Sequence, residues 1–277
     1  MGEANRKLKL RQRLLKAHPL CAYCGDIATT TDHCPPRTFF EARHWPETYE
    51  FPACQPCNAN ARLDEQALAV LIRCRLTELR SEADQLEWEK LVRGVTNNQP
   101  QMMAEWKNVT RNDVKRGLRY AFGSDGDARR SRGWGLANMG PLTQAAIRRF
   151  MIKLAKALYY RHNNHVFDGV IYVRHVDRFS KDTTPEFIGE MLRMAPGSPK
   201  IARNGKPLFD QFIYRFNHSP QHRVMYAVVQ FGDQFIFQLI AIGPEMDAQL
   251  MRMNPDWRLE NPARHECFLT PPVSGGS

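Results

Sequence analysis

Two pairs of cysteines with the same internal spacing carry the strongest chemical signal in this sequence. Cys21-Ala-Tyr-Cys24 and Cys54-Gln-Pro-Cys57 are both CxxC motifs. Two such knuckles supply the four thiolates of a closed tetrahedral zinc site, whereas a redox CxxC motif does not come in duplicate. Four unrelated buried cysteines would not explain the paired spacing. We therefore predict that these four cysteines bind a structural Zn²⁺ ion.

The segment between the two knuckles contains a second group of residues capable of chemistry. It includes Thr31-Asp32-His33-Cys34-Pro35-Pro36, and the second knuckle runs directly into Asn58. Phosphodiester hydrolysis needs a base for the attacking water and a cation near the developing negative charge. Histidine titrates near neutral pH, and Asp and Asn oxygens suit Mg²⁺ or Mn²⁺. The alternative is that Asp32 and His33 only cap or line the zinc module.

This combination resembles the HNH endonuclease family, in which an Asp-His pair followed by proline lies between two CxxC knuckles and His or Asn follows the last cysteine. The resemblance covers about residues 21–62, under a quarter of the chain. It implies that His33 is the general base and that Asp32 and Asn58 hold a catalytic Mg²⁺ or Mn²⁺ ion. It also implies a ββα-metal fold for this segment.

Two positions depart from the family's pattern. Tyr49 stands where a middle Asn is usual, and Ala61 stands where a Lys is common. The first departure affects the residue that would orient His33, and the second removes a phosphate contact. Arg37, Arg43 or Arg62 could supply the missing positive charge, or each could be a solvated surface residue.

Positive charge is concentrated in the middle of the chain. The whole sequence has a net charge of +10, and between residues 104 and 163 there are 13 Lys or Arg against 4 acids. This excess favours an anionic partner such as nucleic acid. Residues 122–140 are rich in glycine with little periodicity, which predicts a long loop. Arg129, Arg130 and Arg132 in this loop are candidate nucleic-acid contacts, and a mobile solvated loop is the alternative.

The remaining histidines and cysteines carry weaker signals. His162 and His165 have the spacing of a metal-ligand pair, but they follow a predicted helix end where polar residues are ordinary. Cys34 is expected to be a small buried residue. Cys74 falls in an apolar helical stripe and Cys267 lies among hydrophobic residues, so both are expected to be packed thiols.

The elements that must position these residues follow from periodicity and composition. The pattern predicts short strands and turns within residues 21–60 and four helical regions at 4–17, 63–94 (one or two helices), 101–121 and 141–158. Strands are expected at 166–176, 211–216, 224–231 and 235–242, with a hairpin turn at Phe231-Gly-Asp-Gln. The predicted class is α+β, with a zinc-bound module at 1–62, a helical basic region at 63–163 and an α+β target- or partner-recognition region at 164–277.

Composition limits the class of protein. The hydrophobic fraction is 43% and the charged fraction 25%, as in soluble globular proteins. We find neither a membrane span nor a signal peptide, so we expect a cytoplasmic protein with reduced cysteines. The leading hypothesis is a metal-dependent endonuclease acting on nucleic acid, double-stranded DNA first, in bacterial or phage defence or restriction. The alternatives are a catalytically inactive zinc-containing nucleic-acid-binding protein and a nuclease subunit controlled by a protein partner through the C-terminal region.

Overall fold

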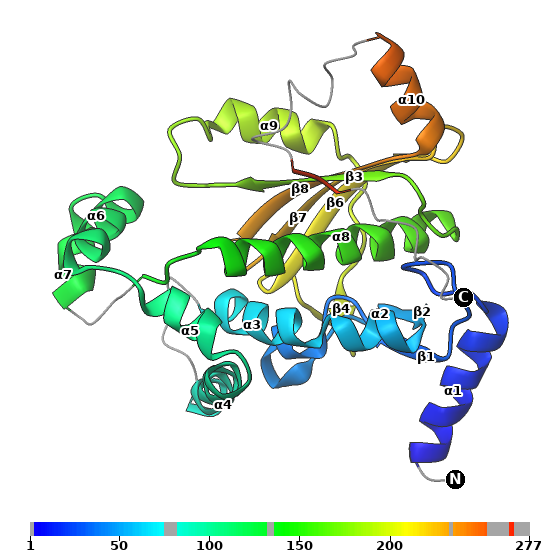
Figure 1. Cartoon of the computed structure of the whole chain (residues 1–277), viewed down its shortest axis with the longest axis horizontal. Helices are drawn as coiled ribbons and strands as arrows, with labels where there is room; N and C mark the ends of the chain where they lie inside the picture. Colours follow the sequence, from blue (N-terminus) through cyan, green and yellow to red (C-terminus); the bar gives the residue numbers. More distant parts are fainter. Residues whose placement is uncertain (1–2, 75–81, 132–135, 233–234, 254–265, 269–277) are drawn as a thin grey trace.

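The computed structural model describes residues 3–74, 82–131, 136–232, 235–253 and 266–268, and its class is α+β as predicted (Figure 1). In the described part of the chain no helix is long and apolar enough to cross a membrane.

The N-terminal segment folds into a helix followed by a strand pair and a second helix. These elements are α1 (Glu3–Ala17), β1 (Thr30–His33), the short 3₁₀ helices η1 (Arg37–Phe39) and η2 (Glu41–Arg43), β2 (Glu50–Ala53) and α2 (Gln55–Asn60). β1 and β2 are antiparallel, and their register sets Asp32 opposite Phe51 and His33 opposite Glu50.

The middle of the chain is helical, with more breaks than we predicted. Its helices are α3 (Arg62–Ile72), α4 (Glu82–Asn98), α5 (Pro100–Lys107), α6 (Arg111–Phe122), α7 (Asp125–Ser131) and α8 (Pro141–Asn163). The single helix expected at 101–121 is two helices, because Thr110 starts α6 with a capping box to Asp113. The prediction of a long loop at 122–140 is wrong in part, since Arg129 and Arg130 lie on α7. An ion pair from Arg119 to Asp127 joins α7 to α6.

The C-terminal segment builds an antiparallel five-stranded sheet in the order β6-β7-β8-β3-β9. Its strands are β3 (Val170–Val176), β6 (Phe212–Ser219), β7 (Val224–Phe231), β8 (Phe235–Ile242) and β9 (Glu266–Phe268), and the segment also contains α9 (Pro185–Arg193), α10 (Pro244–Met253) and the hairpin strands β4 (Ala202–Arg203) and β5 (Lys206–Pro207). Phe231 pairs with Phe235, which confirms the predicted hairpin.

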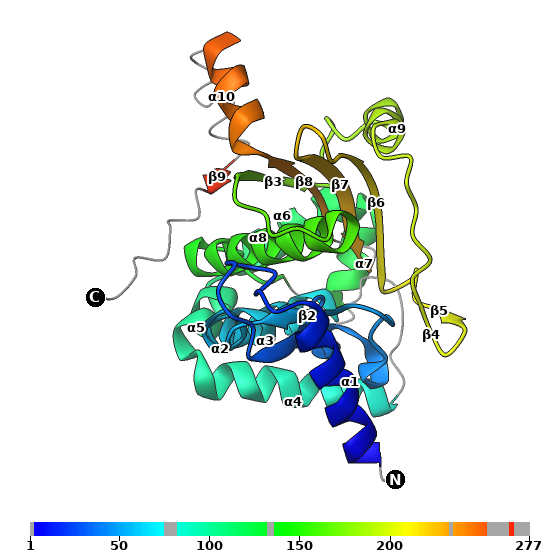
Figure 2. The same ribbon diagram turned by 90° about the vertical axis from the view of Figure 1, so that its right-hand side faces the viewer.

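Helix α8 is the central element of the molecule. Figures 1 and 2 show it lying between the sheet and the α2–α3 layer, while α9 covers the opposite face of the sheet. Its buried residues include Phe150, Leu154 and Leu158. One continuous hydrophobic core extends from Cys21 to Ala241, so the three segments that we distinguished in the sequence all contribute to it.

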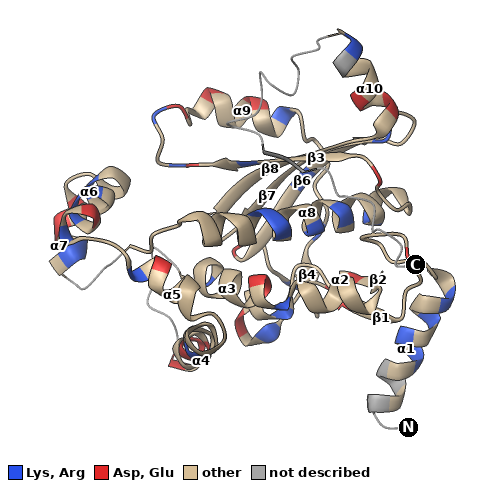
Figure 3. Ribbon diagram, viewed as in Figure 1, with Lys and Arg blue, Asp and Glu red and all other residues tan. Residues whose placement is uncertain are grey.

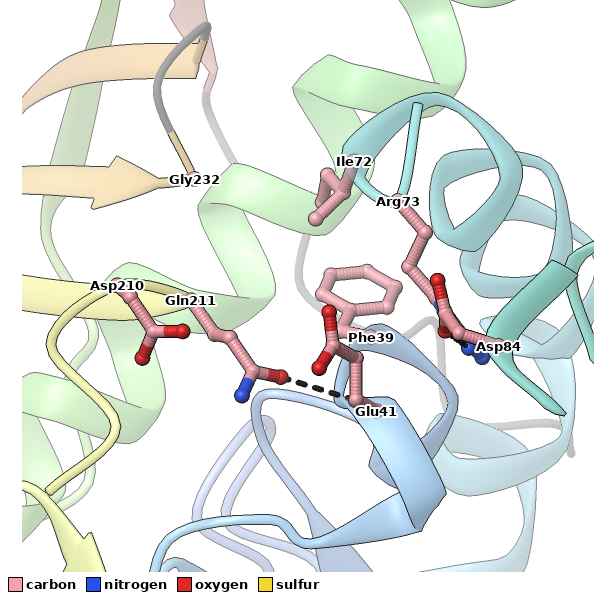
Figure 4. Close-up of a pocket in the computed structure, with 8 residues that line it drawn as sticks. All are labelled: Phe39, Glu41, Ile72, Arg73, Asp84, Asp210, Gln211 and Gly232. Carbon is pink, nitrogen blue, oxygen red and sulfur yellow. Dashed lines mark hydrogen bonds and ion pairs between the residues drawn. The ribbon is translucent and has the colours of Figure 1, made fainter. Parts of the chain in front are cut away.

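A seam between these segments is visible beside the end of the sheet. Figure 4 shows Phe39 and Glu41 of the N-terminal segment facing Gln211. The backbone N–H of Glu41 donates to Gln211 Oε1 at 2.9 Å. On the other side Arg73 forms a buried ion pair with Asp84. The cavity between them measures about 20 Å³, room for about one water molecule, so this seam joins segments and offers no space for a ligand.

Candidate metal centre and adjoining pocket

The four predicted zinc ligands come together in space. Among the described residues, Cys21, Cys24, Cys54 and Cys57 form the one group of three or more His, Cys, Asp or Glu side chains close enough to hold a metal ion, with their Sγ atoms within 4.8 Å of one another. The Sγ atoms of Cys24 and Cys54 are 3.6 Å apart. A tetrahedral site with Zn–S bonds of about 2.3 Å separates its sulfurs by about 3.8 Å. The cluster therefore has the size of a zinc site, and a disulfide would need a far shorter contact.

Local structure and electrostatics both favour a cation at this cluster. Cys54 is the N-cap of α2, and its Sγ accepts a hydrogen bond from the backbone N–H of Cys57. A hydrogen bond from the Cys57 thiol lowers the pKa of Cys21 to about 5, whereas burial raises the pKa of Cys24 to about 12. Repulsion from Cys21 raises the pKa of Cys24 further. A dication would offset the charge of all four.

Lys156 of α8 lies beside this cluster. Its Nζ donates to the Tyr23 carbonyl oxygen at 2.7 Å. Burial lowers the pKa of Lys156, and the nearby cysteines act in the opposite direction. A cation already faces the thiol cluster from the helix that packs on it.

Asp32 is buried in a network of charged side chains on the other side of the module. Its Oδ2 accepts from the Tyr23 hydroxyl at 2.7 Å and from Lys153 Nζ at 2.7 Å. Lys153 also donates to Glu65 Oε1 at 2.6 Å. Burial opposes charge on Lys153, but Asp32 and Glu65 more than offset it and raise the pKa of Lys153. Burial raises the pKa of Glu65 to about 7.

His33 lies between a cation and a carboxylate. Its Nε2 is 2.6 Å from Glu50 Oε1 and 2.6 Å from Arg37 Nη2. Nε2 can donate to Glu50 when it carries a proton and can accept from Arg37 when it does not. The hydrogen bond from His33 lowers the pKa of Glu50. The imidazole also packs edge-on against Trp45, at 5.0 Å between ring centroids. This arrangement holds the ring in place and gives Nε2 partners for both protonation states.

Asp32, His33 and Asn58 line one open pocket of about 860 Å³. The Asn58 Nδ2 donates to the Thr31 carbonyl at 3.3 Å, so its amide oxygen is the atom that can ligate a metal. With Asp32 and Glu65 the pocket offers hard oxygen donors, which match Mg²⁺ or Mn²⁺. Lys153 already occupies one side of this donor set. The residues fit a divalent ion chemically, and the ion would share Asp32 with an ammonium group.

The pocket has a basic rim, part of which we predicted from the sequence. Arg37, Arg43 and Arg62 all line it. Sequence reasoning missed Glu50, Glu65 and Lys153. Glu50 had a usable signal, because strand pairing sets it opposite His33. Lys153 had none, since it comes from α8 far along the chain.

Several other predicted site residues lie elsewhere. The guanidinium of Arg129 lies 4.1 Å from the Phe122 ring centroid, and Arg130 is 3.8 Å from Asp127. Figure 3 places α7, which carries them, well apart from β1 and α2. Arg132 lies outside the described residues.

The histidine pair does not assemble as metal ligands. His162 stacks on Phe216 at 3.7 Å and shares a hydrogen bond with the Tyr214 hydroxyl. Burial lowers the pKa of His162 to about 4, while His165 is exposed. His162 is therefore part of the packing around the sheet.

The remaining cysteines have mixed outcomes. Cys34 is fully buried, as predicted. The prediction for Cys74 is wrong, because α3 ends at Ile72 and leaves Cys74 exposed. The side chain of Cys267 lies outside the described residues.

Many of the positively charged side chains on α8 have partners within the molecule. Arg149 donates twice to Asp64, both at 2.7 Å. Arg161 donates to the Thr48 carbonyl at 2.7 Å. Together with the buried Lys153 and Lys156, these side chains attach α8 to the N-terminal segment and to α3. The charge excess counted along the sequence is therefore not an exposed basic surface over its whole length.

Comparisons of the chain with protein-family models, curated proteins and solved structures gave no match. The interpretation of the site therefore depends on its geometry and chemistry.

Proposed function

We propose that this chain is a metal-dependent endonuclease of the HNH type that hydrolyses phosphodiester bonds in nucleic acid, with double-stranded DNA as the first substrate to test. The observation that carries the proposal is the shared pocket of Asp32, His33 and Asn58. The three residues come from β1 and α2, and the cysteine cluster that joins the two ends of this unit lies next to them. A strand pair followed by a helix is the arrangement that the family's ββα-metal fold would require.

Each residue of the pocket has a chemical task in this proposal. His33 removes a proton from the attacking water, because the residue lines the pocket and its Nε2 lies beside a carboxylate that can stabilise the charged ring. Arg37 and Arg62 bind the phosphate. Asp32 and Asn58 hold the divalent ion, which would supply positive charge at the phosphate when bound. Zn²⁺ at the four cysteines keeps Asn58, the residue after Cys57, fixed relative to β1.

A second function has a specific observation in its favour. Asp32 is already neutralised by Lys153 and hydrogen-bonded by Tyr23. Tyr49, at the position of the usual middle Asn, has its hydroxyl bonded to Tyr214 rather than to the pocket. A nucleic-acid-binding zinc protein with an inactive site would also have these features.

Substitution of His33 separates the two functions. Plasmid cleavage by the parent protein, with Mg²⁺ or Mn²⁺ added, should fall by about 10² to 10⁴-fold in His33→Ala, as expected for loss of a general base. Zinc content, thermal unfolding and DNA affinity should stay at parental values. His165→Ala is the matched control, because His165 is exposed away from the pocket.

Asp32→Ala and Asn58→Ala should also lose cleavage, because they weaken binding of the divalent ion. Excess Mn²⁺ should restore part of their activity by mass action, but it should not restore the activity of His33→Ala. Parental cleavage rates in His33→Ala would refute the proposal. A parent protein that binds DNA but does not cut it would favour the inactive binder.

A further inference from the structure

Trp45, beside the pocket, is flanked by two arginines from distant parts of the chain. The Cζ atom of Arg37 lies 3.9 Å from the ring centroid, and that of Arg203 lies 3.7 Å from it. Two guanidinium groups this close to one ring centre cannot share a face, so they lie on opposite faces. The indole therefore holds two positive groups in a fixed relation. Because both its faces are taken, it is not free to stack on a base.

Arg203 belongs to the β4–β5 hairpin of the C-terminal segment, which lies beside the N-terminal module in Figure 2. Asn204 and Gly205 form the turn with φ angles of 49° and 78°, as a type I′ turn requires. The hairpin is attached to the loop before β2, because the backbone N–H of Asn204 donates to Glu47 Oε1 at 2.8 Å. Lys206 pairs with Arg203 across the hairpin, so both side chains are on the same face of it.

Positive charge exceeds negative charge along this edge. Arg37, Arg43, Arg203 and Lys206 contribute four cations. The facing carboxylates are Glu50, which is 3.8 Å from Arg37, and Glu47, which caps the hairpin backbone. Burial, followed by repulsion from Arg203 and Arg43, lowers the pKa of Arg37. Guanidinium groups crowded in this way are stabilised by an anion with several oxygens, such as a phosphate.

We infer that the β4–β5 hairpin is a phosphate-binding arm, in which Arg203 and Lys206 contact the nucleic-acid backbone next to the phosphate bound by Arg37 and Arg62. The identity of the polyanion rests on the proposed function. The nucleic-acid backbone would then run from the pocket, past Trp45, onto the C-terminal segment. This assigns part of that segment a direct role in substrate binding.

Salt-dependent binding of a fluorescently labelled DNA duplex tests this inference. The assay uses the full chain with His33→Ala and no added Mg²⁺ or Mn²⁺, so that DNA stays intact and zinc stays bound. Loss of one phosphate contact should reduce the slope of log affinity against log salt by about 0.9, which is about eightfold in affinity at 0.1 M salt. We expect this change for Arg203→Ala. Arg193→Ala is the control, because Arg193 is an exposed arginine on α9 across the sheet.

Lys206→Ala is the second variant, because Lys206 is exposed and is not one of the two cations that flank Trp45. This variant should reduce the slope of log affinity against log salt while its thermal stability stays unchanged. Such a result would show that Lys206 contacts phosphate and that the pocket is not disturbed. If both hairpin variants bind like Arg193→Ala, the arm is refuted and the nuclease proposal stands. If the hairpin variants lose affinity while the protein with native His33 cuts no DNA, the arm stands and the nuclease proposal fails. A parent chain that binds no DNA at any salt concentration overturns the arm.

Discussion

The two sides of the β1–β2–α2 unit are attached to the molecule by different chemistry. On one side four cysteines approach to within 4.8 Å, and on the other Asp32 is paired with Lys153 and bonded to Tyr23. The cysteine side could hold an added cation, which would offset the charge of four thiolates. The Asp32 side has its cation supplied by the chain itself. Two lysines of α8, Lys153 and Lys156, face these two sides.

This difference shows why a small module can depend on the rest of the chain. An isolated zinc module of about 40 residues is held mainly by its metal. Here Lys153 joins Asp32 and Glu65 to α8, and α8 is the central helix of the core. Removing a ligand on the cysteine side and removing the lysine on the Asp32 side should therefore lower the free energy of unfolding by different amounts.

The largest effect is expected from Cys54→Ser, which removes one of four ligands. Bound zinc should be lost and the N-terminal module should unfold, since the metal would join the two cysteine pairs that lie at its ends. Elemental analysis and thermal unfolding measure both consequences. Cys74→Ser is the matched control, because Cys74 is exposed at the end of α3. A Cys54→Ser protein with parental stability, or active parent protein without zinc, would show that the cysteine cluster does not hold a structural metal.

A smaller effect is expected from Lys153→Met, which removes the internal cation from the Asp32 side. The Lys153 and Asp32 side chains are only 9% and 7% exposed, so the change leaves buried carboxylates without their partner, at a cost of about 3–5 kcal/mol in the free energy of unfolding. Chemical denaturation measures it. A cost below about 1 kcal/mol would mean that the pair contributes little.

The same variant tests whether Asp32 also binds metal. With Lys153 gone, added Mn²⁺ should raise the unfolding temperature of Lys153→Met more than that of the parent, because a bound ion stabilises the folded state by mass action. The same titration of a Lys153→Met, Asp32→Asn double variant is the control. Equal responses in all three proteins would make Asp32 an ion-pair residue only.

The sequence predicted the parts of this arrangement that depend on local spacing. The CxxC pairs, the periodic helices and the β7–β8 hairpin are short-range patterns, and all appear in the structure. The Asp32–Lys153 pair could not be predicted, because no local pattern relates β1 to α8. The basic count over residues 104–163 was informative about charge but not about exposure, since Lys153 and Lys156 are buried.

Other misses had a signal that sequence analysis did not use. Asn204-Gly205 is a strong hairpin dipeptide, and it forms the β4–β5 turn that carries Arg203. Thr110 followed by Asp113 resembles a capping box and starts α6. Cys74 appeared to continue an apolar stripe, but the helix ends before it, and boundaries of this kind depend on tertiary packing.

The smallest effect is expected from Lys156→Met on the cysteine side. Lys156 has a carbonyl partner, that of Tyr23, and among the described residues it has no carboxylate contact like those of Lys153. Its removal leaves the Tyr23 carbonyl without this donor. It also removes a charge whose burial is unfavourable, as the lowered pKa of Lys156 indicates. The free energy of unfolding should therefore fall by only about 1 kcal/mol. Denaturation of Lys156→Met and Lys153→Met in parallel, with zinc content checked in both, gives the comparison directly. If Lys156→Met costs as much as Lys153→Met, or releases zinc, then the cysteine side also depends on a cation from α8, and the two sides of the module are held in the same way.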